Sequence, residues 1–257
     1  MFSNFRLKKK WFFAIGAVIL CLGLIAFTEV NHNQKRCRGI VVRIDDRDGQ
    51  RFLTRRDVTG YLTNQGADPL VGDSYRALDF NRLEQRMLRH GLIRRCQISR
   101  DLTGNLIVAV EQPRPVARLV TTYSEARPVQ GQYVSEEGRF FPISMNYSAR
   151  VPLLSGSYFA ARRSLASEKD GALLALLQHI QQDPFWRAQI AELAVEQDGQ
   201  VTMWPQVGNH RIELGTPTDL EAKFKKLKLF YKHVLPYKGW DRYSRVNVQY
   251  RNQIVCE

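Results

Sequence analysis

The longest apolar segment of the chain is an uncharged run at residues 11–28, which directly follows three consecutive lysines at 8–10. A helix of about 18 residues is roughly 27 Å long, close to the ~30 Å hydrocarbon core of a bilayer. In lipid, every backbone amide of such a segment must be hydrogen-bonded within the segment, so the run is stable there only as a helix. The pattern therefore predicts a single N-terminal transmembrane helix over residues 11–28.

Basic residues on both sides of this run determine its expected orientation. Arg6 and the lysines at 8–10 precede it without any acidic residue, which favours a cytoplasmic tail at residues 1–10. Three basic residues between positions 35 and 38 follow it and weaken the asymmetry. We expect the bulk of the chain to lie on the periplasmic or extracytoplasmic side, as in a single-pass type II protein of the inner membrane.

A cleaved signal peptide is the alternative interpretation of the same run. The apolar part of a signal peptide is usually shorter and ends in small residues. Residues 27–31 contain no such cleavage pattern, so we favour an uncleaved anchor followed by a linker at residues 29–36.

Residues 37–112 combine strand-like and helix-like patterns. Thr54 followed by Asp57 is typical of a capping box at a helix start, and Asp79 indicates a second helix start. The β-branched and alternating segments predict strands. The expected order is a strand at 39–44, two helices, and strands at 92–98 and 106–110.

Pro113 and Pro115 mark a boundary, because X-Pro steps interrupt a central strand. The segment 113–257 then predicts a β-rich domain with an extended, mostly antiparallel sheet and flanking helices, and the whole chain is of the α+β class. The last predicted strand covers residues 244–250, near the end of the chain.

Two helices are predicted within this β-rich domain. The first has a capping signal at Ser167 with Asp170 and is expected to end before Pro184. The second has Thr216 as cap and Pro217 as first residue.

The formal net charge is +13 over 257 residues. Acidic and basic residues interleave along most of the chain, as on an ordinary solvated surface, so we do not expect nucleic-acid binding. The one dense basic cluster is the lysine-rich segment 223–228, which we interpret as an exposed helix face.

Three cysteines follow the apolar run, Cys37, Cys96 and Cys256. Either one pair or no pair is compatible with their spacing.

Motifs for catalysis and cofactor binding are missing from the sequence. It contains no G-x-S-x-G, S-x-x-K, P-loop, G-x-G-x-x-G or H-E-x-x-H pattern, and its five histidines are isolated. We therefore predict a protein that binds other proteins rather than an enzyme, with no cofactor, no metal and no small-molecule substrate.

In its ordered set of segments, the chain resembles the FtsQ/DivIB family of bacterial cell-division proteins. The short basic tail, the membrane helix and the strand-helix-helix-strand-strand unit are similar to the family's anchor and POTRA domain. The later segments similar to family elements are Val110–Arg118, Tyr133–Phe141, Val151–Gly156, His210–Gly215 and Arg245–Tyr250.

This resemblance implies a non-enzymatic scaffold of the divisome at the division septum, which recruits and regulates septal peptidoglycan synthesis through FtsB and FtsL. The family takes up FtsB by adding a strand at the edge of the C-terminal sheet, next to the last strand and its adjoining helix. The resemblance places partner contacts at Tyr250, Arg245, Val248, Gln249 and Arg251. Asn247 and Gln249 stand where the family pattern has an acidic and a basic residue, so an ion pair at those positions is not carried over.

Two other functions are compatible with parts of this pattern. A POTRA-containing factor for protein transport or envelope assembly shares the first unit and would bind a β-barrel or secretion partner. A membrane-anchored wall hydrolase or transferase would share only the anchor and would turn over peptidoglycan.

Overall fold

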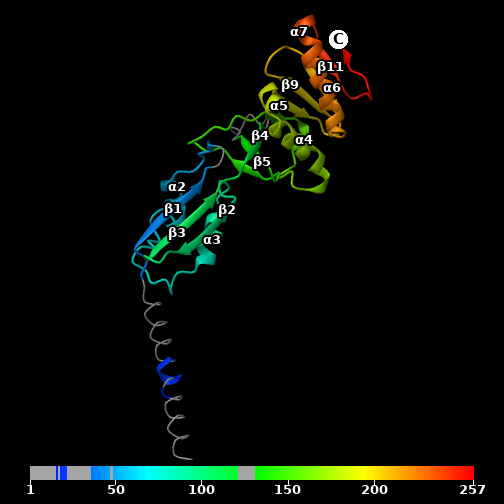
Figure 1. Cartoon of the computed structure of the whole chain (residues 1–257). Helices are drawn as coiled ribbons and strands as arrows, with labels where there is room; N and C mark the ends of the chain where they lie inside the picture. Colours follow the sequence, from blue (N-terminus) through cyan, green and yellow to red (C-terminus); the bar gives the residue numbers. More distant parts are fainter. Residues whose placement is uncertain (1–15, 17, 22–35, 47–48, 121–130) are drawn as a thin grey trace, which may run out of the picture. The chain divides into compact units, whose positions relative to one another are not determined.

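The computed structural model describes residues 16, 18–21, 36–46, 49–120 and 131–257 (Figure 1). The predicted transmembrane segment 11–28, like the predicted tail 1–10 and most of the linker 29–36, lies largely outside these residues. Among the residues that are described, no helix is both long and apolar enough to cross a bilayer.

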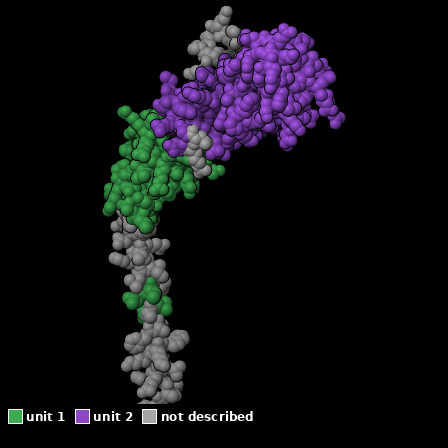
Figure 2. All heavy atoms as spheres, turned by 45° about the horizontal axis from the view of Figure 1, so that its top comes forward, with its two compact units in different colours: residues 1–45, 54–90, 95–111 green, residues 46–53, 91–94, 112–257 purple. Residues whose placement is uncertain are grey.

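The chain folds into two compact units (Figure 2). The first unit contains the residues up to Asp45 together with Thr54–His90 and Arg95–Glu111, and the second contains Asp46–Leu53, Gly91–Arg94 and Gln112–Glu257. Two short segments within the predicted range 37–112 thus group with the second unit.

The first unit has the predicted order of strand, two helices and two strands. Its sheet has the order β1-β3-β2, with β1 parallel and β2 antiparallel to β3. Helix α2 packs on β1, helix α3 packs on β2, and the two helices contact each other, so both cover one face of the sheet (Figure 1). The elements are β1 (Gly39–Asp45), α2 (Arg55–Leu62), α3 (Phe80–Leu88), β2 (Arg95–Arg100) and β3 (Asn105–Glu111).

Local signals account for the helix starts in the first unit. The Thr54 hydroxyl accepts a hydrogen bond from the Asp57 N–H at 3.2 Å, and the Asp57 carboxylate accepts one from the Thr54 N–H at 2.8 Å. This reciprocal pair is the predicted capping box. Asp79 caps α3 by accepting a hydrogen bond from the Arg82 N–H at 3.0 Å.

The second unit is built on a nine-stranded sheet with the order β12-β11-β10-β9-β8-β7-β4-β5-β6. Five of its eight strand pairings are antiparallel, in line with the predicted architecture. The strands are β4 (Pro115–Leu119), β5 (Gln132–Ser135), β6 (Phe140–Pro142), β7 (Leu153–Ser155), β8 (Ile190–Val195), β9 (Val201–Pro205), β10 (Arg211–Gly215), β11 (Arg245–Asn247) and β12 (Val255–Cys256).

The sheet has three parallel pairings, each of which needs a crossover connection, and helices form two of these crossovers. Between β7 and β8 lie the short helical turns η2 (Ser157–Phe159) and η3 (Glu168–Asp170), then α4 (Gly171–Gln182) and α5 (Pro184–Gln189). Between β10 and β11 lie α6 (Leu220–His233) and α7 (Leu235–Lys238). Trp186 of α5 and Phe224 of α6 pack edge to face, with ring centroids 5.0 Å apart, and both belong to the core formed with the sheet.

The predicted starts of both helices in this unit are wrong. Ser167 precedes a 3₁₀ turn, and α4 begins only at Gly171. The carboxylate of Asp170 accepts hydrogen bonds from the hydroxyls of Ser167 and Tyr158, both at 2.6 Å, instead of capping the helix. Helix α6 begins at Leu220 after Asp219, which has a left-handed backbone with φ 51°.

The pair Asp183-Pro184, predicted to end a helix, also begins one. Asp183 accepts a hydrogen bond from the Phe185 N–H at 2.8 Å and caps α5, whose first residue is Pro184. Proline suits this position because its fixed φ is helical and the missing N–H would have no partner there. The same two residues therefore separate and start consecutive helices.

Gly156, directly after β7, has φ 119° and lies against the backbone of β8. A Cβ at this position would lie 2.8 Å from the backbone C and N of Val195 and closer still to its carbonyl oxygen. Because both the conformation and the space exclude a side chain, this glycine is required for the close approach of β7 to β8.

We predict that Gly156→Ala destabilises the second unit by about 3 kcal/mol or more, because the left-handed conformation and the backbone clash add. Gly171→Ala is the matched control, since Gly171 has φ −56° and nothing lies within 4 Å of its Cβ position. Urea unfolding of the two variants measures the difference. If the two variants had equal free energies of unfolding, the close approach of the β7 and β8 backbones at Gly156 would not contribute to stability.

Candidate partner-binding site

The open edge of the second sheet is not the strand that the sequence predicts. The predicted strand 244–250 is a three-residue strand, β11, which lies between β10 and β12. Glu213 and Asn247 are opposite each other across β10 and β11, and Asn247 is opposite Val255 of β12. The chain reverses after β11, with Asn252 at φ 62°, and its last residues cover the position predicted to be open.

In the described part of the chain, the two-residue strand β12 therefore forms the edge of the sheet at this end, and β6 forms the opposite edge. Glu257 donates its N–H to the Arg245 carbonyl at 3.0 Å and accepts the Arg245 N–H at 3.2 Å. Residues of an antiparallel ladder alternate between pairing inward and pointing outward. The N–H and C=O of Cys256 consequently face away from β11, where a further strand would pair.

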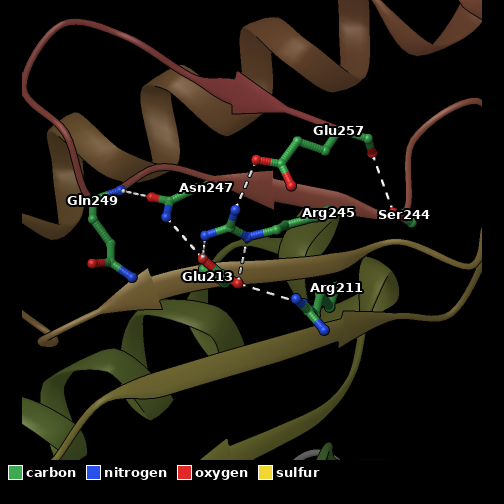
Figure 3. A network of polar contacts seen from close by, with 7 residues as sticks. All are labelled: Arg211, Glu213, Ser244, Arg245, Asn247, Gln249 and Glu257. Atoms are coloured by element: carbon green, nitrogen blue, oxygen red, sulfur yellow. Dashed lines mark hydrogen bonds and ion pairs between the residues drawn. The ribbon is translucent and has the colours of Figure 1, made fainter.

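An ion-pair network ties this edge to the strands behind it (Figure 3). The guanidinium of Arg245 binds Glu213 of β10 through two hydrogen bonds, at 2.7 and 2.8 Å, and binds the Glu257 side chain at 2.8 Å. Asn247 donates to the same Glu213 carboxylate at 2.8 Å, and Arg211 lies 3.4 Å from it. Parallel hydrogen bonds of this kind are stronger and more directional than a single ionic contact.

The network shifts the protonation of its members. The hydrogen bonds from Arg245 lower the pKa of the Glu213 carboxyl, and those same bonds, with the one to Glu257, raise the pKa of the guanidinium. Arg245 is thus a charged structural link among β10, β11 and Glu257 at the C-terminal end. The acidic group beside it comes from β10, while position 247 carries an amide that donates to the same acid.

The loop between β11 and β12 carries the exposed side chains of the site. Tyr250 is 51% exposed and Arg251 is exposed, whereas Val248 is fully buried in the core and does not offer its side chain to a partner. Gln249 is exposed and packs beside Gly215, where an added Cβ would lie 2.7 Å from the Gln249 Cγ. Of the five predicted contact residues, Tyr250, Gln249 and Arg251 remain accessible around the edge.

Lys226, which the sequence predicts to be on an exposed helix face, binds the backbone of this loop. The Lys226 ammonium donates to the carbonyls of Val248 at 2.7 Å and Gln253 at 3.4 Å, and also to that of Tyr250. It therefore holds both ends of the loop that leads into β12. Desolvation lowers the pKa of Lys226, but the carbonyl oxygens compensate its positive charge.

Lys223 is a second exception to the predicted exposed lysine face. Its side chain is buried, and its ammonium donates to the carbonyls of Leu214 at 3.0 Å and Thr216 at 2.7 Å, at the end of β10. The signal was present in the sequence, because Lys223 lies at i+3 from Leu220 and i−4 from Leu227, on the apolar stripe of the helix. The interpretation of all four lysines as one exposed face is wrong for Lys223 and Lys226.

The three cysteines of the two units are free thiols in the structure. Burial raises the pKa of the Cys96 thiol to about 11 and also raises that of Cys256. Neither thiol is activated as a nucleophile by its surroundings. Within the described ranges, no three His, Cys, Asp or Glu side chains are grouped so that they could hold a metal ion.

Comparisons with known proteins relate the second unit to a cell-division family and the first unit to POTRA-like domains. Residues 114–257 match the family model "FtsQ/DivIB, C-terminal related", and residues 35–111 match a POTRA-like domain model. The chain is 29% identical over 184 residues to the "Cell division protein FtsQ" of Rhodothermus marinus. That alignment covers 69% of this chain and 65% of the relative, so the similarity spans slightly less than two thirds of the relative's length.

We predict that Glu213→Gln and Arg245→Met both reduce the pH dependence of folding stability. The pKa of Glu213 is lower in the folded chain than its ordinary value of 4.5, so its contribution is present at neutral pH and is lost as the pH falls through the folded pKa. Urea unfolding between pH 7 and about pH 3 measures the effect. The double variant should lose less free energy of unfolding than the sum of the losses of the two single variants, because each single variant already removes the shared ion pair. A loss in the double variant equal to that sum would contradict the network.

Proposed function

This chain belongs to the FtsQ/DivIB family, and we propose that it is a non-enzymatic cell-division scaffold that binds FtsB and FtsL and thereby recruits and regulates septal peptidoglycan synthesis. The open β12 edge of the second sheet is the observation that carries this proposal. A partner strand placed beside β12 would pair with the outward N–H and C=O of Cys256. Main-chain hydrogen bonds would supply affinity, and the neighbouring side chains would supply specificity.

The expected side-chain contacts surround this edge. Tyr250 offers a large, half-exposed ring, which combines an apolar face with a polar hydroxyl and loses little conformational entropy on binding. Gln249 and Arg251 lie on either side of Tyr250 in the chain and are exposed. Arg245 and Val248 support the edge from behind rather than touching the partner, Arg245 through its ion pairs and Val248 through the core.

The edge that a partner strand could reach is also short. β12 contains only two residues, and the strand behind it has three. A short edge resists unwanted pairing with other chains, which long exposed edges promote. A partner must therefore combine strand addition with contacts to the loop at 248–253.

We place the chain in the inner membrane at the division septum. The tail 1–10 is cytoplasmic, residues 11–28 span the bilayer once, and residues 29–36 connect the span to the domains 37–112 and 113–257 outside the cytoplasm. The uncharged run and the basic residues before it support this topology. The POTRA-like unit provides a second docking surface near the membrane.

A POTRA-like unit alone would equally suit the rival function in protein transport or envelope assembly. The second unit supports the division scaffold, because residues 114–257 match the FtsQ/DivIB C-terminal related model. A transport factor needs no such unit. The division scaffold is therefore the function that accounts for both parts of the chain.

Cys256→Pro tests strand addition directly, because proline removes the outward N–H without removing a hydrogen bond to β11. We expect the affinity of the full chain in detergent for soluble FtsB to fall by about tenfold or more. Cys256→Ala keeps the N–H and should bind as the wild type does. Biolayer interferometry measures both, with circular dichroism as the check on folding. Equal binding of the two variants would exclude pairing at this position.

Tyr250→Ala should weaken FtsB binding about tenfold while leaving the unfolding midpoint unchanged, because the ring is half exposed before binding. Tyr237→Ala is the control, since Tyr237 is 82% exposed and lies on α7 rather than in the loop at 248–253. The same interferometry assay applies. If both variants bind like the wild type, Tyr250 does not belong to the interface.

A further inference from the structure

A groove of about 460 Å³ lies among the helices of the second unit, separate from the residues of the β12 edge. It is bounded by the end of α4, the start of α5 and the outer side of α6. Its lining residues are His179, Asp183, Trp186, Glu221, Phe224, Lys225, Lys228, Leu229, Lys232 and His233.

The floor of this groove is formed by closely packed aromatic rings. Trp186 and Phe224 are 1% and 3% exposed and pack against each other, and the His179 ring lies 4.6 Å from the Phe224 ring. Leu229 stands on the groove wall with 52% of its surface exposed. An apolar side chain entering the groove would contact Leu229 and the edges of the aromatic rings.

Three lysines follow the α6 side of the groove. Lys225, Lys228 and Lys232 are spaced at i, i+3 and i+7, so they lie along one face over roughly 10 Å of helix. Lys228 lies 3.4 Å from the Asp183 carboxylate and over the Phe185 ring. Lys225 and Lys232 have no ion-pair or hydrogen-bond partner among the described residues, unlike Lys223 and Lys226, which bind backbone carbonyls.

We infer that this groove binds an acidic amphipathic helix of a protein partner. The exposed stripe on α6, at positions 221, 225, 228, 229 and 232, has the spacing with which one helix packs along another. A leucine or phenylalanine of the incoming helix fills the groove beside Leu229. Carboxylates on its flanks pair with Lys225 and Lys232, which form no ion pair among the described residues; Glu221, one turn before Lys225 on the same stripe, limits the acidic contacts to the Lys225–Lys232 part of the groove.

The shape of the site favours a helix over a flat anionic surface such as a membrane. A membrane surface would contact the lysines but would leave the floor at Trp186 and Phe224 unfilled. Helix docking also differs from strand addition, because it uses side chains rather than backbone groups. The inference therefore extends the proposed function to a second interaction surface and does not depend on the β12 edge.

The test uses a fluorescein-labelled helical peptide with glutamates at i, i+3 and i+7 around one leucine. The full chain is held in phosphatidylcholine nanodiscs, and fluorescence anisotropy measures binding. We expect Lys225→Glu with Lys232→Glu to weaken binding about tenfold, and Leu229→Glu to weaken it as well. The control is Lys169→Glu with Lys238→Glu, which reverses two exposed charges outside the groove lining and should change binding less than twofold.

Four outcomes would overturn the inference. The first is that the acidic peptide does not bind the wild-type chain, and the second is that a peptide with glutamines in place of the glutamates binds with equal affinity. The third is that the groove variants and the control variant lose equal peptide affinity. The fourth is that the chain binds phosphatidylglycerol vesicles but not the peptide. The last outcome would identify a membrane-facing surface instead. Cys256→Pro should leave peptide binding unchanged, so failure of strand addition and failure of the groove are distinguished.

Discussion

The bidentate ion pair between Arg245 and Glu213 is the interaction on which the C-terminal edge depends. It joins β11 to β10. The same guanidinium makes a third contact, to Glu257, and so holds the residue that follows β12. β11 and β12 contain only three and two residues, so their backbone hydrogen bonds alone give a weak connection. A charged side chain bonded to both neighbours compensates for this shortness.

Helix α6 combines three structural tasks through its lysines. Lys223 satisfies the carbonyls at the end of β10, Lys226 holds the loop before β12, and Lys225, Lys228 and Lys232 point into the groove or toward solvent. The division follows from helical geometry, because neighbouring residues are about 100° apart around the axis. A sequence segment that is uniformly basic thus contains groups with opposite surroundings.

The edge and the groove differ in what they recognise. The edge offers two backbone groups and an exposed tyrosine nearby, so it selects a chain that can become extended. The groove offers an apolar floor and two lysines without an ion pair among the described residues, Lys225 and Lys232, so it selects the side-chain pattern of a helix. A partner with a helical part and an extended part, or two different partners, would engage both surfaces of one scaffold.

Short-range patterns in the sequence were sufficient to predict the order of elements in the first unit, the capping box at Thr54 and Asp57, and the mostly antiparallel sheet of the second unit. The capping box and the element order depend on residues within a few positions of each other, and the strand content of the second unit depends on hydrophobic periodicity. The resemblance of the ordered segments to the FtsQ/DivIB family could also be recognised from sequence. Only the tertiary structure revealed that β12 covers β11, that Lys226 binds the carbonyls of the loop before β12, and that Arg245 binds Glu213, 32 positions earlier in the chain. A two-residue strand has no periodicity to detect, and the partner of a charged side chain is decided by which distant strands the fold brings together.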